Sequence, residues 1–363
     1  MFKILISGYY GFNNIGDESI LKAVIDNLQE RLDGIDITVL SQNPVSTAEK
    51  YGVKSVDRKS IFAIIAAIGK CDLLISGGGS LLQDVTSKRS IIYYLMIINI
   101  ALMMRKKVLI YSQGIGPITS KLNRKLTSGI LKKVSGIVVR DETSKELLTE
   151  IGITPQRVTV TADPVLRIKP VPAYVGMKIL ESEGFIAKDG KRKVGFAIKE
   201  RRQDSAFINE LCISIERLID EQNAQIVLIP FHFSEDMPVI DEIEKRLGDK
   251  VFAVRNKYLT EEMMSIIGNM DVLVGVRLHA LIHAAIMDVS MIAVSYDPKI
   301  NSFMNSVGMK AMCSIYDFNN EFFMEEFGKT ISDERKIKEK VQANIKELIL
   351  KLESNEQMIK ELM

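Results

Sequence analysis

The sequence predicts an α/β protein with two doubly wound domains. Its 363 residues suit two domains of roughly 150 residues each, and 47% hydrophobic residues are enough for two cores. In both halves, short β-branched runs alternate with longer segments of helical period, as in βα units of a parallel sheet. Such sheets bind ligands outside the carboxyl ends of their strands, so functional residues are expected in the loops that follow strands.

The regular alternation loosens once, just after residue 168. We therefore expect a first Rossmann-like domain over 1–168, a linker over 169–192 and a second Rossmann-like domain over 193–331, with the two domains facing a cleft. The pattern of charged and apolar residues over 332–363 predicts one long charged helix that packs across a domain. The expected strands are Lys3–Ser7, Asp36–Leu40, Asp72–Ser76, Val108–Ser112, Gly136–Arg140, Val158–Thr161, Lys193–Ile198, Gln225–Pro230, Val251–Val254, Asp271–Val274 and Met291–Ser295.

Charge and cysteine content exclude several classes of protein. The 48 Lys and Arg residues against 46 Asp and Glu are spread along the chain, which argues against a nucleic-acid-binding surface. An anionic ligand must then be bound by a few well-placed cations. Cys71, Cys212 and Cys313 lie far apart without CxxC spacing, so neither a disulfide framework nor a zinc site is indicated. No metal and no cofactor are expected.

The N-terminal segment lacks the apolar stretch and cleavage site of a secretory signal, so a cytoplasmic location is expected. The longest apolar run, residues 91–104, is shorter than the roughly 20 residues that a membrane-spanning helix needs. We interpret this run as a buried helix, with a membrane-touching surface as the alternative. The basic residues 105–107 that follow would suit an anionic membrane or a solvated helix end.

The loop Gly8–Glu18 follows the first expected strand and leads into a helix. Its sequence, GYYGFNNIGDE, matches neither the GxGxxG nor the GxxxxGK[ST] pattern. The helix N-terminus would present unpaired N–H groups, and Asn13 and Asn14 lie directly before it. Two interpretations of Asp17 remain open: it caps the helix, or its carboxylate holds or deprotonates a sugar hydroxyl.

A run of three glycines ends the strand Asp72–Ser76. Glycine lets a ligand approach the backbone closely, which makes Gly78 and Gly79 candidates for ligand contact. Polar Gln83 and Asp84 follow them. Polar groups also follow later strands of this half, at Gln113, Arg140 and Asp163, so one rim of the first domain is expected to be polar.

The most informative stretch is Gly275–Ala285, GVRLHALIHAA. Arg277 and His279 fall where an apolar strand ends and a helix starts. A guanidinium matches a carboxylate or phosphate, and the helix dipole favours a neutral imidazole that exchanges protons near pH 7. The alternative is an ion pair for Arg277 and a core position for His279; we favour function for His279, and the core for His283.

Two further positions follow strands of the second half. Lys299, in the sequence SYDPK, would add a second cation beside Arg277, unless it is a plain surface lysine. His232 follows the strand Gln225–Pro230, and both substrate contact and a structural role remain open for it.

Together these motifs resemble the polysaccharide pyruvyl transferase family, in particular the CsaB-type enzymes that act on secondary cell-wall polymers. The resemblance spans nearly the whole chain. It depends on Gly8–Glu18, Ser76–Asp84, Gln113–Pro117, Arg277–His279 and Tyr296–Lys299. It implies a fold similar to the two-domain GT-B glycosyltransferases, with the acceptor on the N-terminal side, and phosphoenolpyruvate as donor on the C-terminal side.

The resemblance places Arg277, Leu278 and His279 in the donor site and implicates Lys299 in activity. It defines the acceptor site poorly, so we extrapolate to loop residues of the first domain. The complete assignment is His279 and Asp17 as catalytic; Arg277, Leu278, Lys299 and Arg140 as donor-binding; and Asn13, Asn14, Gly78, Gly79, Gln83, Asp84 and His232 as acceptor or loop contacts.

The implied reaction moves the enolpyruvyl group of phosphoenolpyruvate onto a sugar of a cell-wall polysaccharide precursor, with N-acetylmannosamine as the expected acceptor. The product is a pyruvate ketal and the by-product is phosphate. A glycosyltransferase that uses a nucleotide sugar and a non-catalytic sugar-binding module are the alternatives. The sequence does not decide whether the protein forms a homo-oligomer. It also does not decide whether a lipid-linked acceptor brings the enzyme to the inner face of the membrane.

Overall fold

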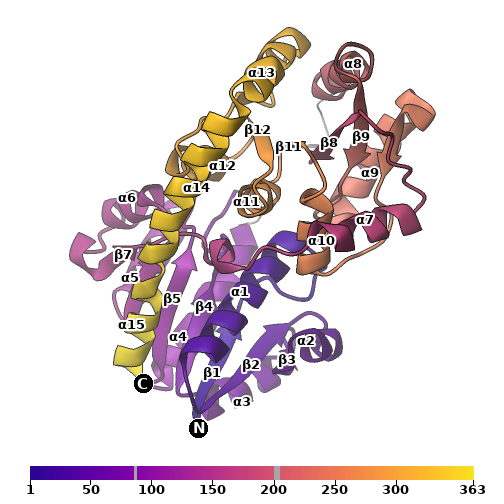
Figure 1. The fold of residues 1–363 in the computed structure, drawn as a ribbon. Helices are drawn as coiled ribbons and strands as arrows, with labels where there is room; N and C mark the ends of the chain where they lie inside the picture. The colour runs from indigo at the N-terminus through magenta and orange to yellow at the C-terminus, as the bar shows by residue number, and fades with distance from the viewer. Residues whose placement is uncertain (86–87, 200–204) are drawn as a thin grey trace. The chain divides into compact units, whose positions relative to one another are not determined.

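The computed structural model describes residues 1–85, 88–199 and 205–363, and the chain divides into two compact units (Figure 1). The first unit comprises Met1–Arg167 together with Leu348–Met363, and the second is Ile168–Glu347. The chain therefore leaves the first unit once and returns to it for its last residues. Both units are α/β, and each has its own parallel sheet.

The first unit has a seven-stranded sheet in the order β3-β2-β1-β4-β5-β6-β7. All its strand pairs are parallel. The order reverses between β1 and β4, which is where doubly wound sheets bind ligands. The strands are β1 (Phe2–Ser7), β2 (Ile35–Ser41), β3 (Lys54–Asp57), β4 (Leu73–Gly77), β5 (Lys107–Gln113), β6 (Gly136–Val139) and β7 (Val158–Val160).

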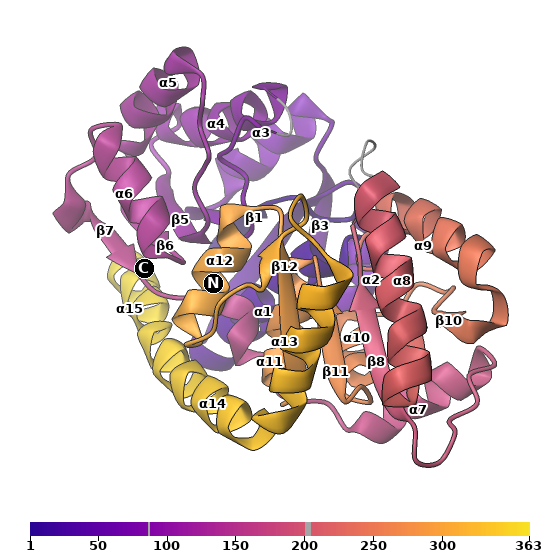
Figure 2. The same cartoon turned by 90° about the horizontal axis from the view of Figure 1, so that it is seen from above.

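Helices cover both faces of this sheet (Figure 2). On one face, Ile64, Leu95 and Leu131 from three successive helices share a buried cluster with strand residues. On the other face, Asn27 of the first helix donates from Nδ2 to the Tyr111 hydroxyl at 3.2 Å. The helices are α1 (Ile15–Arg31), α2 (Pro44–Tyr51), α3 (Ile61–Lys70), α4 (Lys88–Met103), α5 (Lys121–Leu131), α6 (Glu142–Glu150) and α15 (Glu353–Leu362).

The second unit has a six-stranded sheet in the order β10-β9-β8-β11-β12-β13, and this order reverses between β8 and β11. Its core joins the strands to α8, α9 and α13. The strands are β8 (Arg192–Ala197), β9 (Ala224–Leu228), β10 (Val251–Ala253), β11 (Val272–Gly275), β12 (Ser290–Ser295) and β13 (Cys313–Ser314). The helices are α7 (Ala173–Ser182), α8 (Ser205–Gln222), α9 (Phe233–Leu247), α10 (Thr260–Ile267), α11 (Leu278–Ile286), α12 (Pro298–Ser306), α13 (Asn320–Ser332) and α14 (Glu334–Lys351).

Two regions differ in detail from the sequence-based expectation. The expected linker, 169–192, contains α7, where a Cβ on Gly176 would come within 2.3 Å of the Ser265 backbone in α10. The helix expected over 332–363 is interrupted at Leu352, which separates α14 from α15. Within the described part of the chain, no helix has both the length and the apolar character needed to cross a bilayer.

The N-terminus of α1 is capped by Asn14, not by Asp17 as one interpretation held. The Asn14 backbone is extended, and its Oδ1 accepts from the Gly16 N–H at 3.1 Å. Its Nδ2 donates to Asp17 Oδ2 at 2.6 Å. Asparagine is a strong N-cap because its side-chain oxygen satisfies an N–H group that has no partner within the helix. Asp17 therefore lies one turn further in, with its position fixed by the cap.

Candidate functional site

In the second unit, polar residues follow four neighbouring strands at the carboxyl edge of the sheet. Lys199 follows β8, His232 follows β9, Arg277 follows β11 and Tyr296 follows β12. Because β8 and β11 are adjacent although distant in sequence, Lys199 and Arg277 flank the point where strand order reverses. The sheet therefore assembles this group from four separate loops.

Arg277 is the most deeply buried cation of this group, at 9% exposed. Its Nη2 contacts Asp236 Oδ1, and also Glu235 Oε2 at 3.2 Å. Burial lowers the pKa of Arg277, but the carboxylates of Asp236 and Glu235 outweigh burial and leave that pKa raised. Arg277 Nε is buried and has no hydrogen-bond partner among the residues that the structure describes. The carboxylates of Asp236 and Glu235 thus hold the guanidinium of Arg277 in place, while its Nε–H has no partner among the described residues.

Asp236 explains why Arg277 is fixed. It is 0% exposed, and its Oδ2 accepts from the backbone N–H groups of Phe231 and His232 at 2.9 and 2.8 Å. One carboxylate therefore binds the turn after β9 and the arginine after β11. A charged group this deeply buried requires such partners.

Glu235 links the remaining charged groups of this edge. Its Oε1 lies 3.1 Å from His232 Nδ1, and its Oε2 lies 3.4 Å from Lys199 Nζ. The hydrogen bond from His232 is the main cause that holds the pKa of Glu235 well below its ordinary value, against burial and with help from Lys199. Burial, and then the charge of Arg277, lower the pKa of Lys199. The group thus combines two cations with carboxylates and an imidazole.

The helix starts predicted to carry the donor site lie at the same edge. Leu278 is the first residue of α11, and half-buried His279 lies in its first turn. Lys299 lies in the first turn of α12, where its backbone N–H donates to Asp297 Oδ1 at 3.1 Å and its Nζ lies 3.7 Å from Asp297 Oδ2. Because β11 and β12 are neighbours, these two helices start from adjoining strand ends. His283 is fully buried, with its ring 5.5 Å from that of Phe231, as a core residue would be.

In the first unit, Asp17 lies against the glycine turn that follows β4. A Cβ on Gly79, whose φ is +67°, would come within 3.1 Å of Asp17 Oδ1. Gly78, with φ +30°, has a different constraint, since a Cβ there would meet Ile20 of α1 at 1.9 Å. Gly78 is therefore required for helix packing, and Gly79 for a left-handed turn under Asp17. Asn13, in the loop after β1, is exposed.

Arg140 lies at the same edge of the first unit, after β6. It is 9% exposed, and its Nη1 binds Asp163 Oδ2 at 2.8 Å. Its Nη2 lies 3.4 Å from Ser80 Oγ, and a Cβ on Gly114 would come within 2.8 Å of its Nε. The structure therefore brings Arg140 together with the turns after β4 and β5.

Asp84 and Gln83 have local partners. Asp84 is buried and accepts from the backbone N–H groups of Thr119 and Ser120, the Thr119 hydroxyl and Asn123 Nδ2, at 2.7 to 3.0 Å. Although burial raises it, these hydrogen bonds lower the pKa of Asp84 to about 2. Asp84 thus fastens the loop after β4 to the start of α5, and Gln83 Oε1 accepts from Val85 N–H at 2.9 Å in a local turn.

Sequence reasoning did not single out Arg58, which follows the short strand β3. Its guanidinium donates to the Gly8 carbonyl at 2.9 Å and to the Tyr94 hydroxyl at 3.2 Å. Four aromatic rings lie with their centroids 4.7 to 5.8 Å from its Cζ, in the range of cation–π contacts. They are the rings of Tyr9, Phe12, Tyr93 and Tyr94. Arg58 thereby joins the loop after β1 to α4.

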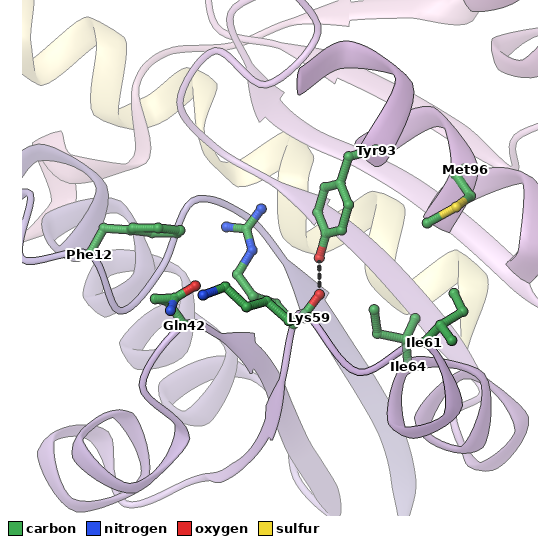
Figure 3. A pocket seen from close by; sticks show the side chains of 8 residues that line it. Phe12, Gln42, Lys59, Ile61, Ile64, Tyr93 and Met96 are labelled. Atoms are coloured by element: carbon green, nitrogen blue, oxygen red, sulfur yellow. Dashed lines mark hydrogen bonds between the residues drawn. The ribbon is translucent and has the colours of Figure 1, made fainter. Parts of the chain in front are cut away.

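A pocket of about 590 Å³ adjoins Arg58 (Figure 3). Figure 3 shows Phe12, Gln42 and Lys59 on one side of it and Ile61, Ile64 and Met96 on the other. Gln42 Oε1 is buried, and no described residue bonds to it. Gln42 and Arg58 follow β2 and β3, so the pocket lies at the carboxyl edge of the sheet.

Buried Tyr10 was also missed. Burial and the nearby Asp17 carboxylate raise the pKa of Tyr10 well above its ordinary value, and its hydroxyl has no hydrogen-bond partner within 1–85, 88–199 and 205–363.

In the second unit, Lys199, Glu235 and Asp236 were missed. In the sequence, Lys199 follows a predicted strand, and Glu235 and Asp236 lie at the start of a helix. These positions indicate a site only once the order of the strands is known.

Among the described residues, no group of three or more His, Cys, Asp or Glu side chains could hold a metal ion.

Solved structures with this fold are GT-B glycosyltransferases and epimerases. Anabaena Alr3699/HepE in complex with UDP-glucose matches with a TM-score of 0.63 and 12% identity, over 100% of this chain and 99% of that chain. A glycosyltransferase from Rickettsia africae ESF-5 matches with 0.65 and 13%, over 99% and 98%. UDP-GlcNAc 2-epimerase from Neisseria meningitidis, bound to UDP-GlcNAc, matches with 0.62 and 16%, over 94% of both chains. The predicted fold class, a GT-B-like pair of Rossmann-like domains, is confirmed.

Sequence comparison then gives the family. The family model "Polysaccharide pyruvyl transferase" matches residues 14–298. The "Amylovoran biosynthesis protein AmsJ" of Erwinia amylovora is 21% identical over 377 residues, which cover 86% of this chain and 88% of that protein. The chain belongs to the polysaccharide pyruvyl transferase family, as predicted, and is a transferase with a role in pyruvyl transfer for polysaccharide biosynthesis. The narrower CsaB-type assignment stays a prediction.

Proposed function

We propose that this enzyme uses phosphoenolpyruvate to place a pyruvate ketal on a sugar of a cell-wall polysaccharide precursor, in the cytoplasm. One observation carries the proposal: at the carboxyl edge of the second sheet, rigidly held Arg277 retains a buried Nε–H without a described partner. Lys199 and the start of α11 accompany it there. Small anions with two charged groups match such a set of donors.

The donor site assigned here lies on the second unit. Phosphoenolpyruvate carries a phosphate and a carboxylate, and the cations proposed for them are Arg277, Lys299 and the newly found Lys199. Leu278 opens α11, so backbone N–H groups of its first turn add positive potential. Arg140 belongs to the first unit, where it is paired with Asp163. Its expected contact with the donor therefore stays a prediction.

The chemistry requires a proton donor and a base. A proton is added to the methylene carbon of phosphoenolpyruvate, which leaves an oxocarbenium-like centre at the neighbouring carbon. A sugar hydroxyl attacks this carbon and loses its proton, and the carbon–oxygen bond to phosphate then breaks. A second hydroxyl of the same sugar attacks, loses its proton and closes the ketal. We assign the first proton transfer to His279.

The acceptor side is assigned to the first unit. Asp17 is held by Asn14 beside the left-handed turn at Gly79, and its carboxylate is the proposed base for an acceptor hydroxyl. Asn13 and Asn14 supply amide groups that suit sugar hydroxyls. Asp84 and Gln83 act indirectly in this assignment, since their partners hold the loop after β4. His232 acts through Glu235, with which it is hydrogen-bonded.

The test uses purified protein, phosphoenolpyruvate and a disaccharide that contains N-acetylmannosamine. The expected result is phosphate release together with a product heavier by one pyruvate less one water. Absence of product with this sugar and with a panel of other hexosamine acceptors would contradict the proposal.

A nucleotide-sugar glycosyltransferase is the second candidate, because solved relatives of the same fold are bound to UDP-sugars. The same assay with UDP-glucose or UDP-GlcNAc in place of phosphoenolpyruvate distinguishes the two. We expect neither tight binding nor turnover of these nucleotides. Transfer of their sugar, without consumption of phosphoenolpyruvate, would select the second candidate.

A further inference from the structure

The outer surface of α3 and α4 carries an unusual number of exposed apolar side chains. Phe62 is 83% exposed and Met103 is 75% exposed. Four more residues of these helices are at least 38% exposed. We call these six residues the apolar face: Ile61, Phe62, Ile65, Ile92, Met96 and Met103.

These side chains are not needed for the core of the first unit. In α4, Ile91, Leu95 and Ile98 are buried in the cluster against the sheet. Ile92, Met96 and Met103 recur at the period of a helix on the opposite side. Residues 91–104 contain no charged residue, so the solvent side of this helix lacks the charges that such a side normally carries. α3 packs beside α4 and extends the same surface (Figure 2).

Positive charge predominates in the sequence around the apolar face. Between residues 58 and 140 the sequence has fourteen Lys and Arg residues against two Asp residues, although the whole chain is nearly neutral. Of those two, Asp84 is buried, and exposed Asp72 accepts from the Lys3 N–H at 2.8 Å at the amino edge of the sheet, where Lys70 and Arg105 also lie. Exposed cations lie at the ends of α3 and α4 and along α5: Lys59, Lys70, Arg105, Lys107, Lys121 and Lys125.

We propose that the apolar face docks onto an anionic lipid membrane. Exposed apolar groups bordered by Lys and Arg are the combination that inserts into the headgroup region of a bilayer while attracting acidic lipids. A second copy of this chain is a poorer occupant, because two-fold pairing through this face would bring cations against cations. This inference concerns localisation and does not depend on the reaction.

Docking would also place the pocket beside Arg58 at the surface of the membrane. The pocket shares Ile61 and Met96 with the apolar face and has Lys59 and Gln42 on its other side. An apolar wall and a polar, cationic wall would then meet at the boundary between lipid and water.

The test is co-sedimentation of the full chain with vesicles. Vesicles of phosphatidylcholine with about one third phosphatidylglycerol are compared with pure phosphatidylcholine. We expect binding to the anionic vesicles only, weakening as salt is raised. Removing one cation, by Arg105→Gln or Lys70→Gln, should weaken binding roughly fivefold. Phe62→Ser with Met103→Ser should weaken it by at least about tenfold.

Matched controls use the second unit. Phe322 in α13 is 67% exposed, so Phe322→Ser removes an exposed phenylalanine that is not part of the apolar face. Lys336→Gln is the control for charge, since Lys336 is exposed on α14. Both controls should bind vesicles like the wild type, and all variants should keep the wild-type melting temperature.

Three results would overturn the inference. The first is no binding to anionic vesicles at low salt, and the second is an equal loss of binding in Phe322→Ser. The third is a change of oligomeric state in Phe62→Ser with unchanged vesicle binding, which would assign the apolar face to a second copy. Loss of vesicle binding with full pyruvyl transfer to a soluble acceptor would support docking and leave the proposed reaction intact.

Discussion

Arg277 is both the partner of buried Asp236 and the proposed ligand of the donor. Replacing it with an apolar residue leaves Asp236 charged and without its cation at 0% exposure. We expect Arg277→Met to lower the free energy of unfolding by about 3–5 kcal/mol, because an uncompensated buried charge is strongly destabilising. Urea unfolding followed by circular dichroism measures this change.

A double variant separates the structural role of Arg277 from its role in binding. Adding Asp236→Asn to Arg277→Met should restore part of the stability, since the buried charge is gone while the asparagine Oδ1 can still accept from the backbone N–H groups of Phe231 and His232. Turnover should stay low in the double variant, because the donor has lost its arginine. Restored turnover together with restored stability would mean that Arg277 acts only through Asp236.

His279 is predicted to act on the reaction and not on the fold. It is half-buried in the first turn of α11, and its replacement by alanine leaves the helix core unchanged. His279→Ala should lower kcat by about 10²- to 10⁴-fold, with a smaller change in KM for phosphoenolpyruvate. Steady-state phosphate release measures both constants. Near-wild-type kcat with an unchanged melting temperature would exclude His279 from proton transfer.

At the scale of elements, Asp84 determines how the loop after β4 joins α5. Its pKa is lowered to about 2, so its contribution to stability is fully present above the unfolded pKa near 4 and is lost as pH falls through 2. Asp84→Asn should cost about 2 kcal/mol at pH 7, and the difference from wild type should shrink below pH 4. Urea unfolding at pH 7, 5 and 3 measures the trend.

The control for Asp84 is Asp33→Asn, at an exposed position after α1. It should change the free energy of unfolding by less than about 0.5 kcal/mol at each pH. A constant difference between wild type and Asp84→Asn from pH 7 to pH 3 would show that the hydrogen bonds of Asp84 do not depend on its charge.

Two glycines with similar φ isolate the effect of Asp17 on the turn after β4. Gly52 has φ +63° with nothing within 4 Å of a built Cβ, and Gly79 has φ +67° with Asp17 Oδ1 at 3.1 Å. Gly52→Ala should cost about 1–2 kcal/mol from the left-handed angle alone. Gly79→Ala should cost at least as much and also lower turnover, because the new methyl group displaces Asp17. Equal turnover in the two variants would contradict the role of Asp17.

The sequence predicts most elements of the fold because the pattern of apolar and polar residues shows which segments are buried. Buried strands such as β11, VLVG, are continuous apolar runs, and the predicted strands of both units are present. The edge strands β3 and β13 were missed, since β3 (KSVD) is short and only partly buried and β13 has only two residues. Asn14 was missed as the cap because Asp17 is also a good capping residue and sequence alone does not rank them.

The candidate site was predicted less completely. Arg277 and His279 stand out because a cation and an imidazole follow an apolar strand directly. Lys199 and Asp236 join them only through the order β9-β8-β11, which sequence order does not reveal. The aromatic surroundings of Arg58 likewise come from two distant segments, the loop after β1 and α4.

For the whole molecule, the first unit depends on the far end of the chain. Ile359 of α15 is 0% exposed, Asn355 Nδ2 donates to Ser112 Oγ at 2.8 Å, and Glu356 pairs with Arg167. We expect Ile359→Ala to lower the free energy of unfolding by about 2–5 kcal/mol. Leu350→Ala, at a 62% exposed position of α14, should cost less than about 0.5 kcal/mol. Equal melting temperatures for the two variants would contradict the role of α15 in the first unit.

The return of the chain to its first unit also orders events on the ribosome. Residues 1–167 emerge first, yet Met358 of α15, whose side chain lies against Gly136 of β6, emerges only after the whole second unit. Until α15 has emerged, that part of the nascent sheet lacks this helix and is open to chaperones or to aggregation. The second unit, whose residues are contiguous, can fold beforehand.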